Sequence, residues 1–265
     1  SRVLSFYEIV FYLSFGLGIL FISLNLQSST LFIISACFIM FSSIPLNLIR
    51  IKEPALPEKS PISLPKIFNI APLALLTSFV GGMLMNGFFS MASLFVLLQG
   101  YDAKAVSYFI FFGIMGGFFA QSVIGIISDA LGRKFAIILS SSFAFLSMLL
   151  YVFFVPTLLW QYLLSLFLGM GIFCLYSLAL ARANDMLEDK SKRVELGRAV
   201  LFFYSLGSLI APLALGALME YFSFKGFVWF YLLSLSFLIL FAINKPNKKK
   251  GKYQRNLKSV VLNDD

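Results

Sequence analysis

The chain has 265 residues, of which 60% are hydrophobic and 12% charged, with 32 phenylalanines and a formal net charge of +9. Soluble globular domains carry roughly 25% charged residues, so this composition excludes a water-soluble protein. The chain has no histidine, and Cys37 and Cys174 both lie in apolar runs. These features argue against a disulfide framework, a metal site, a cofactor or an enzyme. We therefore predict an all-α, polytopic membrane protein.

Eight runs of the sequence are apolar enough to be read as transmembrane helices. A helix needs about 20 predominantly apolar residues to cross the hydrocarbon core of a bilayer. Inside lipid the helices satisfy their own backbone hydrogen bonds and pack on one another. The predicted spans cover approximately residues 4–23, 30–49, 68–98, 105–127, 135–155, 157–181, 195–219 and 226–243.

Residues 50–67 separate the first two spans from the other six. This stretch carries four prolines among mixed charges, and proline opposes continuous helix, so we predict a cytoplasmic linker. Residues 245–265 form a basic tail, for which we expect a disordered segment near anionic lipid. The predicted divisions are residues 1–49, the linker 50–67, a six-helix part 68–244 and the tail 245–265.

Basic residues predict the orientation of these spans. If odd-numbered spans run outward from the cytoplasm, every lysine and arginine except Lys104 and Lys225 falls on the cytoplasmic side. Because positive charge is enriched in cytoplasmic loops, we expect both ends of the chain in the cytoplasm and the spans in the plasma membrane. The basic excess is then a topology signal, and no nucleic-acid partner is expected.

A short charged island, GIISDALGRK, occupies residues 125–134 between two apolar spans. We expect a tight loop at the membrane surface. Gly125 would allow two helices to approach closely, and Gly132 would supply the backbone freedom of a sharp turn. Arg133 and Lys134 would hold this loop on the cytoplasmic side.

The pattern G-x-x-x-D-x-x-G-R-K resembles the signature loop of the major facilitator superfamily of secondary transporters. In that family the loop lies between the second and third helices of a six-helix half, and here it lies between the second and third spans after the linker. A basic residue often follows the aspartate in the family, whereas this chain has Ala130. Residues 176–220 also resemble a poorly characterised bacterial subgroup of the same family.

This resemblance implies that the chain helps to transport a small solute by alternating access. Residues 1–49 would then be the last two helices of a first half, and the four helices that precede them in the same protein would be missing from this chain. A non-transporting membrane sensor or structural protein of similar sequence is the alternative.

The resemblance also implies a gate. Asp129 would face the N-terminal end of the first span, near residues 1–4, and Arg133 would pair with Asp185 at the end of the sixth span. Gly125, Gly132 and Lys134 complete the predicted gating motif. These contacts would join the two halves on the cytoplasmic side and would break when the protein opens inward. The simpler alternative is that Asp129 satisfies a surface loop.

Few polar side chains lie within the spans, so few candidates exist for solute contact. They are Asn86, Gln121, Tyr176 and Tyr204, and interhelical hydrogen bonding is at least as good an explanation for each of them. We expect Gln121 to brace the motif. Glu8, the carboxylate well inside the first span, is the candidate for coupling to a proton or cation. Ser208, Pro212 and Gly216 form a stripe that predicts close packing of the seventh span.

Overall fold

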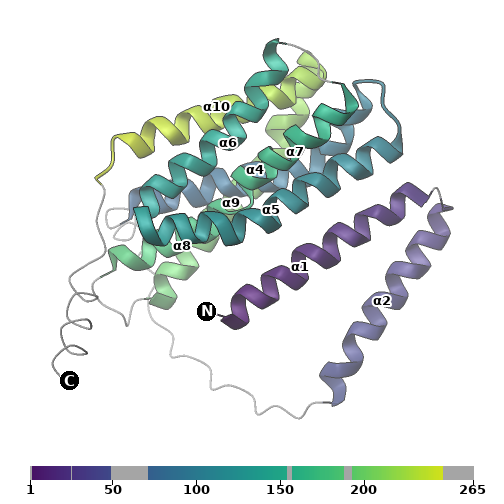
Figure 1. The fold of residues 1–265 in the computed structure, drawn as a ribbon, viewed down its shortest axis with the longest axis horizontal. Coiled ribbons are helices and arrows are strands. Elements are labelled where there is room, and N and C mark those ends of the chain that lie inside the picture. Colours follow the sequence, from purple (N-terminus) through teal and green to yellow (C-terminus); the bar gives the residue numbers. More distant parts are fainter. Residues whose placement is uncertain (1, 25, 49–70, 154–156, 188–192, 247–265) are drawn as a thin grey trace.

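The computed structural model describes residues 2–24, 26–48, 71–153, 157–187 and 193–246. Every regular element in these residues is helical, which confirms the predicted all-α class. In chain order the elements are α1 (Arg2–Leu20), the 3-10 helix η1 (Phe21–Leu24), α2 (Ser28–Leu48), α4 (Pro72–Leu97), α5 (Ala103–Leu131), α6 (Arg133–Phe153), α7 (Leu158–Ile172), α8 (Leu175–Met186), α9 (Arg193–Phe222) and α10 (Phe224–Ile243) (Figure 1).

Most of these helices are long and apolar enough to cross a membrane. This holds for α2, α4, α5, α6, α9 and α10, and for α7 and α8 taken together. The first predicted span corresponds to α1 and η1, which contain the shorter apolar stretch Val10–Leu24. The sixth predicted span is not one helix, because α7 ends at Ile172 and α8 begins at Leu175.

Helices α4 to α10 form one bundle, and α1 lies along α5 at its side (Figure 1). Within the bundle, α4 packs on α9, α5 packs on α7, and α6 packs on both α7 and α10. Helix α2 extends away from the bundle and buries none of the residues whose burial is described. The large buried core therefore lies in the part of the chain after the predicted linker.

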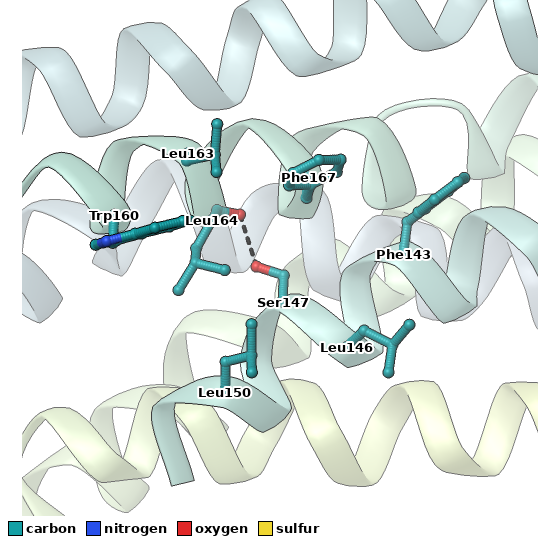
Figure 2. A pocket seen from close by; sticks show the side chains of 8 residues that line it. All are labelled: Phe143, Leu146, Ser147, Leu150, Trp160, Leu163, Leu164 and Phe167. Carbon is teal, nitrogen blue, oxygen red and sulfur yellow. Dashed lines mark hydrogen bonds between the residues drawn. The ribbon is translucent and has the colours of Figure 1, made fainter. Parts of the chain in front are cut away.

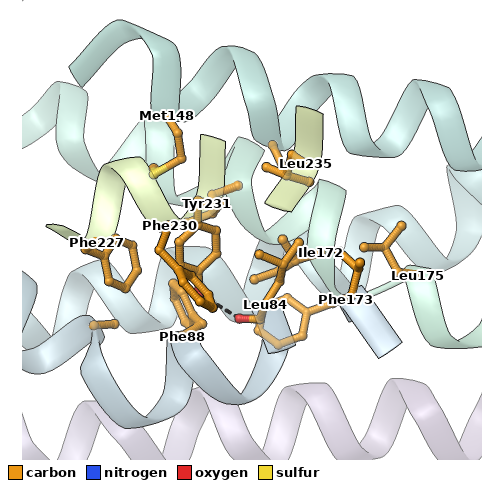
Figure 3. Packing of buried hydrophobic residues seen from close by; sticks show 14 of the residues in the cluster. Leu84, Phe88, Met148, Ile172, Phe173, Leu175, Phe227, Phe230, Tyr231 and Leu235 are labelled. Carbon is orange, nitrogen blue, oxygen red and sulfur yellow. Dashed lines mark hydrogen bonds between the residues drawn. The ribbon is translucent and has the colours of Figure 1, made fainter. Parts of the chain in front are cut away.

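Aromatic side chains fill the centre of this core (Figure 3). The ring of Phe227 stacks on those of Phe95 and Tyr231, with 4.5 Å between centroids in each case. The fully buried Tyr231 hydroxyl donates a hydrogen bond of 2.6 Å to the carbonyl oxygen of Leu84. The bond joins α10 to α4 and satisfies a polar group that would be costly to leave unpaired in lipid.

Other buried hydroxyl groups also donate to backbone carbonyl groups of neighbouring helices. Ser78 Oγ on α4 donates to the Val200 carbonyl of α9 at 2.7 Å. Ser165 Oγ on α7 donates to the Phe109 carbonyl of α5 at 2.6 Å. A carbonyl oxygen has two lone pairs and can accept such a bond besides its own helical one, so these contacts join helices without breaking either.

Glycines allow α4 and α9 to touch through their backbones. A Cβ atom at Gly82 would overlap the Tyr204 carbonyl, and one at Gly207 would overlap the Phe79 carbonyl. The sequence predicted that α9 packs through Ser208, Pro212 and Gly216. The residues that α9 buries lie one position earlier, at Gly207, Ala211 and Leu215. Of the predicted stripe, Ser208 Oγ donates to the Gly82 carbonyl at 3.3 Å, whereas Gly216 makes no close approach.

Candidate functional site

The charged island at residues 125–134 is not the loop that we expected from its sequence. Residues 125–131 form the last turns of α5, and α6 begins at Arg133, so Gly132 alone connects the two helices. Gly132 has φ 100° and ψ 156°, a conformation that only glycine adopts without strain. A Cβ at Gly125 would meet no described atom within 4 Å, so the close helix packing predicted at Gly125 stays a prediction.

Arg133 joins the ends of three helices. Its Nη1 lies 2.8 Å from Asp129 Oδ1 and donates a 2.8 Å hydrogen bond to Ser128 Oγ, both on α5. Its Nε donates to Asp185 Oδ2 on α8 at 3.0 Å. The structure thus contains the Arg133–Asp185 pair that the resemblance implies.

Exposure to solvent weakens the ion pairs of Arg133 with Asp129 and Asp185. The side chains of Asp129 and Asp185 are 62% and 49% exposed, against 21% for Arg133. Ion pairs at this exposure contribute below about 1 kcal/mol each, so they can form and break reversibly. The predicted contact of Asp129 with the start of the first span, near residues 1–4, involves side chains that lie outside the described part of the structure.

Lys134 and Arg182 bind the C-terminal end of α10, which the sequence analysis did not predict. Lys134 Nζ donates to the carbonyl oxygens of Ile243 at 2.8 Å and Lys245 at 2.5 Å. Arg182, whose residue is only 5% exposed, donates from Nη2 to the Pro246 carbonyl at 3.1 Å. Cations at a helix C-terminus satisfy its last carbonyls and its dipole, so α6 and α8 together cap α10.

Three of the candidate polar residues gather where α4, α8 and α9 meet. The rings of Tyr176 and Tyr204 lie edge to face with 4.9 Å between centroids. The Tyr204 hydroxyl contacts Met85 Sδ at 3.0 Å. Asn86 Nδ2 donates to the Ser208 carbonyl at 2.7 Å. Each side chain therefore has an interhelical partner and is also partly accessible.

Gln121 does not brace the motif, contrary to our expectation. Its Nε2 donates to the Tyr12 hydroxyl on α1 at 3.4 Å, and its Oε1 accepts from Ser177 Oγ on α8 at 3.5 Å. The ring of Tyr12 also lies edge to face with Phe173, with centroids 6.0 Å apart. Gln121 is thus part of the contact between α1 and the bundle.

Glu8, the coupling candidate, belongs to α1, but its side chain lies outside the described part of the structure. Its role in coupling stays a prediction. None of the described residues forms a cluster of histidine, cysteine, aspartate or glutamate that could hold a metal ion.

Comparison with known proteins establishes the family. Residues 1–194 match the sequence model described as Major Facilitator Superfamily. The chain belongs to the major facilitator superfamily. As a member of this superfamily with helices of membrane-spanning length, it is a multi-pass integral membrane protein.

Individual relatives in the superfamily are distant. The chain is 23% identical over 250 residues to the uncharacterized MFS-type transporter YcaD of Escherichia fergusonii, which covers 91% of this chain and 62% of that protein. It is 24% identical over 251 residues to the proteins of that name from Salmonella paratyphi B and Salmonella newport, with the same coverage. The chain therefore spans about 62% of the length of these relatives.

Proposed function

We propose that this chain forms part of a transporter that moves a small solute across the membrane by alternating access. The observation that carries the proposal is the contact of Arg133 with Asp129 on α5 and Asp185 on α8, in a protein of the major facilitator superfamily. The relatives named as MFS-type transporters support the same function. In this proposal the protein is a carrier, not an enzyme, and works without a cofactor.

Arg133, Asp129 and Asp185 form a charge cluster. This charge cluster would act as a gate on the cytoplasmic side. Arg133 holds the ends of α5, α6 and α8 together, and Asp129 would add a contact with the N-terminal end of α1. A helix N-terminus carries partial positive charge, which stabilises a nearby carboxylate. With these contacts made, the outward-open state would be favoured, and the inward-open state would require them to break.

The domain arrangement in this proposal follows the predicted divisions. Residues 1–49 would be the last two helices of an N-terminal half, joined by the linker 50–67 to a six-helix C-terminal half at 68–244. The chain spans about 62% of the length of the relatives, which leaves room for four preceding helices in the whole protein. Both ends of the chain would lie in the cytoplasm, with the spans in the inner membrane of a bacterium.

Solute contact would involve the face where α4, α8 and α9 meet. Asn86, Tyr176 and Tyr204 lie there and are partly accessible. Gln121 would contribute less to solute binding, because its hydrogen bonds join α1 to α5 and α8. Glu8 would carry any coupling proton or cation, and Glu8→Gln would then remove the pH dependence of transport.

The gate can be tested with Asp129→Asn in the full-length protein, reconstituted in liposomes. We expect a changed rate of solute flux and a changed balance between inward-open and outward-open states, measured by labelling of single introduced cysteines with an impermeant maleimide. Asp102→Asn is the matched control. Asp102 caps the opposite end of α5, accepting a 2.9 Å bond from the Ala105 amide, and asparagine is an equally good cap.

Two results would count against this proposal in different ways. If Asp129→Asn behaves like Asp102→Asn in both flux and labelling, the motif is not a gate. If the folded wild-type protein moves none of a broad panel of sugars, amino acids, organic acids and organic cations, the non-transporting alternative is favoured.

A further inference from the structure

A groove of about 450 Å³ runs between α6 and α7 (Figure 2). Its walls are two matching stripes of side chains at positions i, i+3, i+4 and i+7, one on each helix. Such a stripe follows one face of a helix for about 10 Å. The groove is therefore long and narrow and runs along the helices.

The floor of the groove is small and presents no free polar group. Ser147 on α6 is 2% exposed, and its Oγ donates a 2.6 Å hydrogen bond to the Leu164 carbonyl of α7 (Figure 2). The bond satisfies the hydroxyl within the floor, and a serine in place of a larger residue leaves the space open. The rest of the lining consists of leucine, phenylalanine and tryptophan side chains.

The groove opens on the exposed surface of the bundle, which would face hydrocarbon in a bilayer. Its rim includes Leu163, which is 42% exposed, and Trp160, which is 58% exposed. Helix α1 lies along α5, on a different side of the bundle from α6 (Figure 1). Further helices that pack around α1 and α2 would therefore leave the groove open to lipid.

The groove also has a direction relative to the membrane. It is lined by the second half of α6 and the first half of α7, so it lies toward the membrane surface opposite Arg133. Trp160 is in the first turn of α7, and tryptophan is enriched at the level of the lipid headgroups. A lipid of the leaflet remote from the charge cluster can thus reach the groove.

We propose that this groove binds one acyl chain of a phospholipid from that leaflet. An extended hydrocarbon chain matches the long, narrow shape of the groove and its apolar lining. Apart from the indole N–H of Trp160 at the rim, the lining side chains offer water no unpaired hydrogen-bonding group. A helix of a second copy is about 10–12 Å across and could place only side chains inside. The proposal depends on the membrane location of α6 and α7 and not on transport.

The proposal is tested with the full-length protein in bilayers of phosphatidylglycerol that carries a photoactivatable diazirine on one acyl chain. After irradiation, mass spectrometry locates the adducts. We expect adducts on the rim residues Leu146 and Leu163 to be several times more frequent than on Leu233 and Leu240, which are lipid-exposed residues of α10.

Two variants that narrow the groove make the test specific. Ser147→Phe fills the floor, and Leu163→Trp enlarges an exposed wall residue without disturbing the core. Either change should reduce the rim adducts to the level found on α10, and Leu233→Phe, a change of lipid-exposed bulk elsewhere, should not. The Leu163→Trp variant keeps the test valid if Ser147→Phe does not fold.

Three outcomes would overturn the proposal. Adducts could be spread evenly over the exposed leucines of α6, α7 and α10, which would indicate bulk lipid only. The frequency of rim adducts in a folded Ser147→Phe or Leu163→Trp protein could equal that in the wild type. Finally, Leu163→Cys could form disulfide-linked pairs of chains in the membrane, which would assign the groove to a second copy.

Discussion

Gly82 and Gly207 fix the distance between α4 and α9, because each faces a backbone carbonyl of the other helix. We expect Gly207→Ala to lower the free energy of unfolding by roughly 1–3 kcal/mol or more, since the added Cβ must push two backbones apart. The measurement is the thermal unfolding midpoint of the purified protein in detergent.

Gly197→Ala is the control for this change. Gly197 lies in the same helix, and a Cβ there would meet nothing within 4 Å. Alanine is favoured over glycine in a helix by about 1 kcal/mol, so this variant should be as stable as the wild type or slightly more stable. Equal midpoints for the two variants would show that the backbones are not in contact at Gly207.

The residues of the charge cluster differ in how far the sequence could predict their contacts. Arg133 and Asp185 carry opposite charges in a recognisable motif, so their pairing could be expected from the resemblance. The partners of Lys134 are backbone carbonyls at the end of α10. Every residue has a carbonyl, so no side chain in the sequence indicates this contact.

At the scale of elements, the capping of α10 leads to a second prediction. Lys134→Met keeps the length of the side chain and removes its charge, so the last carbonyls of α10 lose their donor. We expect faster hydrogen exchange in the last turn of α10, measured by mass spectrometry. Global stability should change by below about 1 kcal/mol, as for other charges at helix ends.

Lys225→Met provides the comparison, because Lys225 lies in the first turn of the same helix. This variant should leave exchange at the C-terminal end of α10 unchanged. If exchange there is the same in Lys134→Met, wild type and the control, the two hydrogen bonds do not hold the helix end in solution.

Hydropathy predicted where most helices lie but not where they are interrupted. A bilayer requires long apolar runs, and these are visible in any sequence. The break at Phe173 and Cys174 between α7 and α8 has equally apolar residues on both sides. Conversely, the charges at 129–134 suggested a loop, although charged residues at a membrane surface can equally end one helix and begin the next.

At the scale of the whole molecule, the distribution of lysine and arginine predicts that both ends of this chain are cytoplasmic. Alkaline phosphatase fused after Lys245 should be inactive in cells, and green fluorescent protein at the same place should fluoresce. Phosphatase inserted at Gly100, between α4 and α5, should be active. The reverse pattern would invert the orientation and would place the charge cluster on the outer surface.

The hydrogen bonds from buried hydroxyls to backbone carbonyls bear on how far this sequence can diverge. The helix that accepts such a bond offers a carbonyl oxygen whichever residue stands at Val200, Phe109 or Leu84. Only the residue that donates must carry a hydroxyl group. The residue that accepts through its backbone carbonyl can be of any type. The bundle can therefore keep these hydrogen bonds between helices while the residues on the accepting helices are substituted.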